Sequence, residues 1–327
     1  MQRLAVALVA LLVPSCLWSR VQMVASVVDI GPMVPKSQLI FHGQVISVTP
    51  LGHEFSFDAV ARFQVDRRYK GASAISELKF STLGISGHNC IRFKPGTNWI
   101  VFANEDGGHL TLVDDCYGAL PVSHQLAPLL DNAGPTAQME ADFAAGLSDS
   151  DPSARICSIQ RLGNLGLRES LPALWRVVDA GDTTETKWAM LALLRCGDVS
   201  VLPLVKSLLA RGNDREEPER IVAIQLKYVS DRAAVPDLLE ILANSPGSLA
   251  RWSVLSALAE IKDPRSLPGL AANLADSDES TRYMALIGMQ NITHSTACKL
   301  PATGYLKDEA ALCLSWWEKE GRSASGK

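Results

Sequence analysis

The sequence predicts a multidomain protein with β structure before α structure: a small, closed, five-stranded β-barrel, then an α-α superhelix of paired helices. Three observations support this fold class. A chain of 327 residues is too long for one ordinary hydrophobic core. Residues 38 to 115 contain short strand-like runs separated by turn residues. Residues from 154 onward repeat a two-helix pattern about every 32 residues.

The composition is that of an ordinary globular protein, with 47% hydrophobic and 20% charged residues. The formal net charge is −4, and no run or stripe of lysine and arginine appears along the chain. Because nucleic-acid binding depends on such a basic surface, we expect no nucleic-acid partner.

The first residues predict export. Arg3 is followed by the apolar run LAVALVALLV, residues 4 to 13, which has the length of a signal-peptide core and is too short to span a bilayer. No later hydrophobic segment reaches membrane-spanning length. We therefore expect a signal peptide within residues 1–26, and a buried amino-terminal helix remains the alternative.

Two cleavage sites are open. The segment VPSC, residues 13 to 16, resembles a bacterial lipobox, in which Cys16 would be acylated and become the mature amino terminus. Pro14 departs from the small or aliphatic residue usual there, and Ala25 with Ser26 offers a later site. We expect a periplasmic, secreted or outer-membrane lipoprotein location, with membrane attachment only if Cys16 is lipidated.

Five strands account for the front half. They are QLIFHGQVISV (38–48), FSFDAVARFQV (55–65), SELKFSTL (76–83), NWIVFA (98–103) and HLTLVDD (109–115). In the second strand one face carries Phe57, Ala59, Ala61, Phe63 and Val65. Asp106 and Gly107 are expected to supply the positive-φ pair of a tight hairpin. No helix here is long enough to cover a sheet, so closure into a barrel is the expected way to remove the exposed edges.

Spaced features of this region resemble the netrin-like module. They are VDRRYKG (65–71), Cys90, FKPGTNWIVFA (93–103) and LTLVDDC (110–116), in that order. The resemblance covers residues 36–120 and implies an OB-like barrel of the kind shared with the tissue inhibitors of metalloproteinases.

The same resemblance implies that Cys90 and Cys116 are disulfide-bonded. In the inhibitors, each of these positions pairs with one member of an amino-terminal Cys-x-Cys, whereas this chain has only Cys16 followed by Leu17 and Trp18. Cys90 and Cys116 are therefore expected to pair with each other in an oxidising compartment. Metalloprotease inhibition in that family uses the amino-terminal cysteine to chelate zinc, so this function remains an alternative that requires a mature terminus at Cys16.

A metal site is the other interpretation of these cysteines. His88 shares a strand face with Cys90, and His109 and Asp114 lie near Cys116 in the sequence. Zinc sites favour four converging ligands with paired spacings such as Cys-x2-Cys, which the sequence lacks, so we expect no metal.

The back half repeats. Four segments align without gaps: SLPALWRVV (170–178), VLPLVKSLL (201–209), AVPDLLEIL (234–242) and SLPGLAANL (266–274). Their prolines, Pro172, Pro203, Pro236 and Pro268, lie 31, 33 and 32 residues apart and fit the first turn of a helix. Aliphatic residues two, five and six positions later form one stripe, which Asn273 interrupts in the last copy.

Helices of a second set lie between these. Each has a basic residue, a large apolar residue and an aliphatic three positions later: ARICSI (154–159), TKWAML (186–191), ERIVAI (219–224), ARWSVL (250–255) and TRYMAL (281–286). The paired pattern, over residues 150–293, resembles HEAT repeats and implies an armadillo-type solenoid that binds proteins.

The expected solenoid occupies residues 139–327, after a linker at 121–138. Its front is capped by Met139, Phe143 and Leu147, and a last helix within 305–322 closes the core with Leu312, Trp316 and Trp317. Cys298 and Cys313 flank the turn into that helix and can pair across it, whereas Cys157 and Cys196 are interpreted as small buried residues.

No catalytic residue or cofactor site is predicted, because the sequence holds no HExxH, GxSxG, GxxxxGK[ST] or GxGxxG motif. We expect a non-enzymatic scaffold whose concave face binds a protein through positions three and four after each proline. The candidates are Trp175, Arg176, Lys206 and Glu240. In the alternative interpretation, Trp175 packs against the neighbouring repeat and the charges are solvated. A further alternative is a lyase-like enzyme, by similarity to phycobiliprotein lyases with comparable short repeats.

Overall fold

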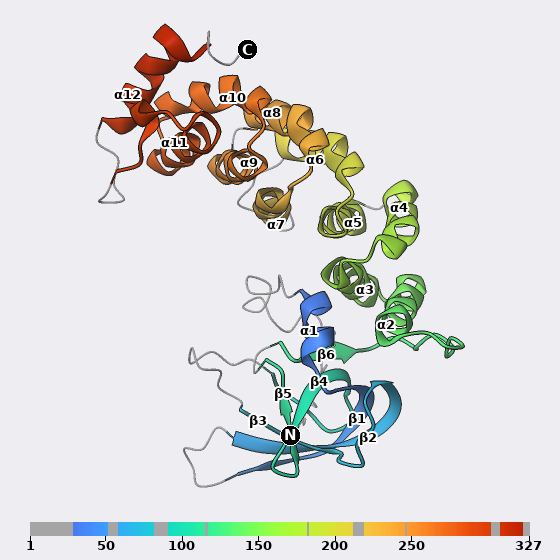
Figure 1. The fold of residues 1–327 in the computed structure, drawn as a ribbon. Coiled ribbons are helices and arrows are strands. Elements are labelled where there is room, and N and C mark those ends of the chain that lie inside the picture. Colours follow the sequence, from blue (N-terminus) through green and yellow to red (C-terminus); the bar gives the residue numbers. More distant parts are fainter. Residues whose placement is uncertain are drawn as a thin grey trace, which may run out of the picture. The chain divides into compact units, whose positions relative to one another are not determined.

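The computed structural model describes residues 29–51, 58–81, 91–114, 117–181, 183–211, 219–245, 247–301 and 308–322 (Figure 1). Contacts within the chain divide it into two compact units, with the boundary between Gly166 and Leu167. A barrel comes first and the repeated helices follow, which confirms the predicted fold class. The predicted limits of the barrel, linker and solenoid stay predictions.

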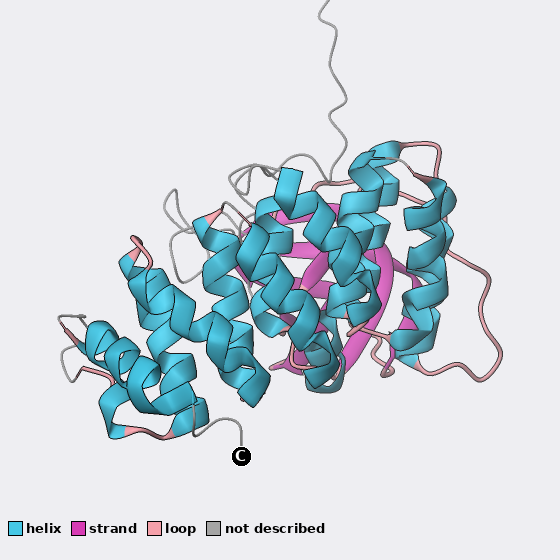
Figure 2. Ribbon diagram, turned by 90° about the horizontal axis from the view of Figure 1, so that it is seen from above, coloured by secondary structure: helices cyan, strands magenta, loops and turns pink. Residues whose placement is uncertain are grey.

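The described strands are β1 (Leu39–Pro50), β2 (Asp58–Lys70), β3 (Glu77–Ser81), β4 (Asn98–Asp106), β5 (His109–Leu112) and β6 (Ala119–Val122). Their order is β1-β2-β3-β5-β4, and β4 pairs back onto β1, so five strands close a barrel. The β3–β5 pairing is parallel, while the other pairings are antiparallel. In Figure 2 these strands are magenta and the helices cyan.

The sixth strand, β6, was not predicted. It is four residues long, contains Pro121 and pairs with β4. Proline lacks the amide that a ladder uses, so the sequence pattern argues against a strand here. The strand tolerates this proline because it borders β4 alone among the described strands.

Apolar side chains of the barrel meet in one core. Of the β2 residues predicted to share one face, Ala59, Ala61 and Phe63 are buried in this core, and Val65 packs against it. Phe57 lies outside the described residues. Aromatic rings meet edge to face with centroids 4.8–5.4 Å apart, a favoured geometry for ring quadrupoles.

The hairpin between β4 and β5 turns one residue later than predicted. Asp106 still pairs with His109, so Gly107 and Gly108 are the two turn residues, with φ of 56° and 83°. Both angles are positive, the conformation that a two-residue hairpin requires and that glycine adopts without steric cost.

Helices of the first unit are α1 (Ile30–Lys36), α2 (Pro135–Ala145) and α3 (Pro152–Leu165). Those of the second are α4 (Leu171–Ala180), α5 (Thr183–Arg195), α6 (Leu202–Arg211), α7 (Glu219–Gln225), α8 (Val235–Asn244), α9 (Ser248–Ile261), α10 (Leu267–Ala272), α11 (Glu279–Thr293) and α12 (Glu309–Trp316). A π-helical segment, Trp317–Gly321, continues α12.

The second unit is a two-layered array. Helices α4, α6, α8 and α10 carry the four repeated prolines near their first turn and form one row, while α5, α7, α9 and α11 form the other (Figure 1). At the end of the array Trp317 is buried as predicted, but Leu312 is 61% exposed and does not join the core. Within the described part of the chain, no helix combines the length and the apolar character needed to cross a bilayer.

Candidate functional site

A short 3₁₀ turn precedes each proline-bearing helix. In three copies the turn begins with an aspartate five residues before the proline, and its carboxylate accepts a backbone N–H two residues later. The pairs are Asp198 with Ser200 at 3.0 Å, Asp231 with Ala233 at 2.8 Å, and Asp263 with Arg265 at 2.9 Å. Such a bond satisfies an amide that the helical turn leaves unpaired. The first copy has Leu167 at this position and lacks the bond.

Trp175 lies half-buried on α4 and contacts the next repeat. Its indole Nε1 donates a hydrogen bond to Asp198 Oδ2 at 2.7 Å, so one carboxylate holds its own turn and the preceding helix. Burial alone would raise the pKa of Asp198, but hydrogen bonds from Ser200 and Trp175 lower it below the usual value. This geometry favours the structural interpretation of Trp175.

Lys206 and Glu240 pair with each other. Lys206 on α6 donates from Nζ to Glu240 Oε2 on α8, with 33% and 57% of the two side chains exposed. The hydrogen bond with Glu240 raises the pKa of Lys206. Arg176 is exposed on α4, and its Nε donates to the backbone oxygen of Pro172 at 3.3 Å. The predicted binding residues thus lie on α4, α6 and α8, and their binding role stays a prediction.

A third proline-bearing helix, α8, also contacts the next copy through the side chain three residues after its proline. Leu239, three residues after Pro236, reaches α10 at Gly269, where an added Cβ would lie 2.4 Å from Leu239 Cδ2. The side chain three residues after the proline therefore reaches the next copy from α4, α6 and α8. In the fourth copy that residue is Ala271, and Ala272 follows it.

A groove lies where this side chain is missing. It has a volume of about 610 Å³ and is lined by Pro268, Ala271, Ala272, Leu314, Trp317, Glu318 and Arg322. Ala271 and Trp317 form its buried floor, while Ala272 and Glu318 are exposed at its edge. Sequence reasoning missed the groove, although the two alanines and Asn273 already set the last copy apart.

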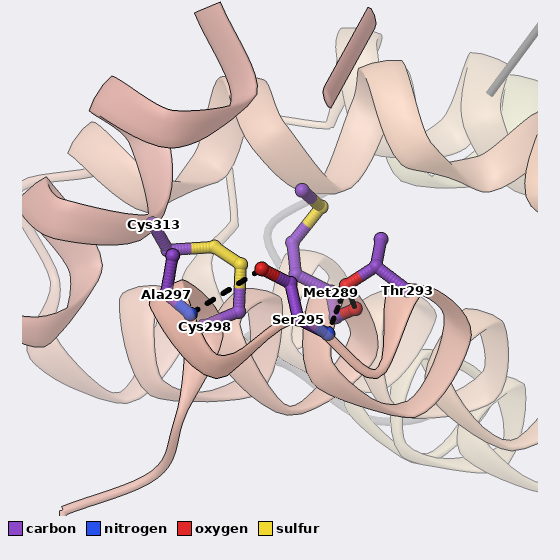
Figure 3. The surroundings of a disulfide bond; sticks show 6 residues. All are labelled: Met289, Thr293, Ser295, Ala297, Cys298 and Cys313. Atoms are coloured by element: carbon purple, nitrogen blue, oxygen red, sulfur yellow. Dashed lines mark hydrogen bonds between the residues drawn. A yellow bond between two sulfur atoms is a disulfide. The ribbon is translucent and has the colours of Figure 1, made fainter. Parts of the chain in front are cut away.

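A disulfide holds the last helix beside the groove. Cys298 and Cys313 are bonded with an S–S distance of 2.02 Å, and both are fully buried (Figure 3). The segment before Cys298 is ordered by hydrogen bonds from the Thr293 hydroxyl to the Met289 backbone oxygen and from the Ser295 amide to Thr293 Oγ1. The pairing considered for these two cysteines is present in the structure.

Of the other five cysteines, the structure describes two, Cys157 and Cys196. Cys157 is buried on α3 and disulfide-bonded, which corrects the interpretation that it is merely a small packed residue. Cys196 is buried as expected. Cys16, Cys90 and Cys116 lie outside the described residues, as does the signal segment.

Asp142 of α2 joins barrel and helices within the first unit. Its side chain is fully buried and forms an ion pair with Arg67 of β2. It also accepts hydrogen bonds from Tyr69 Oη at 2.7 Å and from the Ala127 amide at 3.0 Å. Burial, and then the negative charge of Asp142, raises the pKa of Tyr69. Since Ala127 lies in the predicted linker, that segment is held by defined contacts.

Two more buried bases adjoin this network. His124 places Nε2 2.8 Å from the backbone oxygen of Asp142, and Arg161 of α3 donates to the backbone oxygen of Pro121. Burial lowers the pKa of Arg161 to about 10. Burial and the Arg161 charge lower the pKa of His124. Across the described ranges, no three His, Cys, Asp or Glu side chains converge as a metal site would require.

One comparison with known proteins supports the helical repeats. A family model described as HEAT repeats matches residues 201–290, which lie in the two-layered array. The solved complex of CpcE and CpcF of phycocyanin lyase from Nostoc sp. PCC7120 is 20% identical to the chain. The match covers 54% of this chain and 72% of that one, with a TM-score of 0.38. No curated protein matches the sequence.

Proposed function

We propose that this protein is an exported, non-enzymatic binding protein whose helical repeats hold a protein partner. The observation that carries the proposal is the two-layered array of α4–α11, part of which matches HEAT repeats. Stacked helix pairs present a long continuous surface, which repeat proteins commonly use for protein recognition.

Export is supported by the apolar run at residues 4–13 and by the bonded cysteines Cys298 and Cys313. Disulfides persist in oxidising compartments and are rare in the cytosol. The netrin-like assignment of the barrel belongs to the same proposal, and the closed five-stranded topology agrees with it. Cell fractionation with sequencing of the mature amino terminus tests export. A terminus at Cys16 would favour lipidation or the inhibitor alternative.

The binding function is tested by affinity capture from the envelope fraction of the producing organism, with the whole chain as bait. Arg176→Glu reverses an exposed charge on α4, and Arg68→Glu makes the matched change on the barrel strand β2. We expect a reproducible partner that the first variant loses and the second keeps. Equal loss with both variants, or no partner at all, would contradict binding through the helical array.

A further inference from the structure

The proline-bearing helices differ in the size of the side chain three residues after the proline. Trp175, Lys206 and Leu239 occupy the same position in three copies, and each reaches the following copy. Ala271 occupies this position in the last copy, and its side chain ends at Cβ. A space is therefore left between α10 and the last helix, where a large side chain stands at each earlier junction.

The next position makes the same contrast. The residue four positions after the proline is Arg176, Ser207 or Glu240 in the first three copies. In the last copy it is Ala272. The resulting groove of about 610 Å³ has the size of a ligand pocket, and it is larger than one side chain needs. Its surface is mainly apolar, contributed by Pro268, the two alanines, Leu314 and Trp317.

The groove is lined by two charged residues, Glu318 and Arg322, and they differ in whether they already have a partner within the chain. Arg322 already has an interaction within the chain. Glu318 is exposed and makes no ion pair or hydrogen bond with the described residues. The charge left for a partner is thus negative, and a cation on the partner complements it.

The floor of the groove is held by a disulfide and by close packing. The Cys298–Cys313 disulfide ties α12 to the turn after α11. Trp317 opens the π-helical segment, and an added Cβ at Gly321 would lie 2.6 Å from Trp317 Cε3, so this glycine lets the ring pack against the backbone. Single π-helical turns occur frequently at functional sites. A preformed apolar floor lowers the ordering cost of binding.

We propose that this groove binds a short peptide segment in which a large apolar side chain neighbours a lysine or arginine. The apolar side chain takes the place that Trp175 or Leu239 fills at earlier junctions, and the basic group faces Glu318. The proposal rests on the proposed function of the repeats and names the chemistry of the partner.

The test is calorimetric titration of the full chain with two capped peptides, acetyl-Ala-Trp-Lys-Ala-amide and acetyl-Ala-Trp-Glu-Ala-amide. We expect saturable binding of the lysine peptide, about threefold to fivefold tighter than that of the glutamate peptide, as one exposed ion pair provides. Glu318→Gln should abolish this preference. Failure of the lysine peptide to bind, or retention of the preference in the variant, would overturn the proposal.

A second variant fills the groove. Ala272→Leu places a larger side chain at an exposed lining position and should weaken the lysine peptide at least about tenfold, the effect of losing one buried apolar side chain. Ala210→Leu, at an exposed position of α6, is the matched control and should bind as the wild type does. Equal affinity of wild type and Ala272→Leu would place the peptide elsewhere and overturn the assignment.

Two further experiments detect other occupants of the groove. If removal of residues 323–327 tightened peptide binding more than about tenfold, the chain's own end would be the occupant. A dimer in sedimentation that Ala272→Leu dissociates would identify a second copy. Either result overturns the proposal. If the wild-type chain did not bind the lysine peptide while Ala272→Leu still retained the envelope partner, the groove assignment would fall and the proposed function would stand.

Discussion

His124 is buried beside Arg161, and the two basic groups share one polar region of the first unit. Its Nε2 contacts the Asp142 backbone oxygen, and Nδ1 has no hydrogen-bond partner among the described residues. The other charges that act on it are those of Asp142 and Asp149. The neutral imidazole suits this site, because protonation would add a second buried positive charge next to Arg161.

Acid should therefore destabilise the protein through His124. The pKa of His124 is lowered in the folded chain, so between that value and about 6.5 the unfolded chain binds the extra proton. The contribution of neutral His124 to the free energy of unfolding is fully present above about pH 6.5 and is lost as the pH falls below that value. We expect the free energy of unfolding from urea titrations to decrease from pH 7.5 to 5.5, and His124→Gln to flatten this slope. His109→Gln, at an exposed position, should keep it; equal slopes in both variants would contradict the assignment.

Tyr69 offers a second prediction at this scale. Tyr69→Phe removes a donor from the fully buried Asp142 carboxylate and should lower the free energy of unfolding by about 1–3 kcal/mol. Tyr228→Phe is the matched control, since Tyr228 is 57% exposed, and should change stability by less than about 0.5 kcal/mol. Urea unfolding measures both variants, and a loss no larger than the control's would show that Asp142 does not depend on Tyr69.

Among the structural elements, three aspartate-capped turns precede proline-bearing helices of the array. Asp198, Asp231 and Asp263 each begin a turn, but their further contacts differ. Asp198 also accepts from Trp175 of the preceding copy, and Asp263 lies 3.5 Å from Arg232 Nε of the preceding copy. Hydrogen bonding from Arg265 lowers the pKa of Asp263 to about 2. Two of the three caps therefore also connect neighbouring repeats.

Replacement of these caps should reveal the difference. Asp231→Ala removes a cap and should cost about 1 kcal/mol of stability. Asp198→Ala also leaves the indole N–H of half-buried Trp175 without its acceptor, so the cost should rise to about 2 kcal/mol. Thermal unfolding of the two variants makes the comparison. In the Trp175→Phe background the difference between the two costs should shrink by about 1 kcal/mol, because the Ser200 hydroxyl still bonds to Asp198 alone. An unchanged difference would exclude the indole bond as its cause.

On the scale of the whole molecule, regular patterns made the fold predictable. Alternation along β2 and prolines 31 to 33 residues apart are local signals of strands and repeated helices. The Asp142 network was not predictable, because Arg67 and Tyr69 lie more than 70 residues away and no spacing links them. Predicting the groove required knowing where α12 packs, although Ala271 and Ala272 could be seen to differ from the aligned residues of the other repeats. Trp175 was an ambiguous candidate, since an aromatic residue at its position suits an interface and a repeat junction equally.

The division after Gly166 leads to a last prediction. The partners of Tyr69 in its network lie in the first unit, and the hydrogen-bond partners of Asp198 are Ser200 and Trp175 in the second. Since the described bonds of each network lie within one unit, a change in that network should be felt within that unit. Hydrogen exchange measured by mass spectrometry should show faster exchange in residues 29–166 for Tyr69→Phe and in residues 167–322 for Asp198→Ala. If either variant accelerated exchange across both ranges, barrel and repeats would unfold as one cooperative body, and the linker contacts of Asp142 would extend their influence into the array.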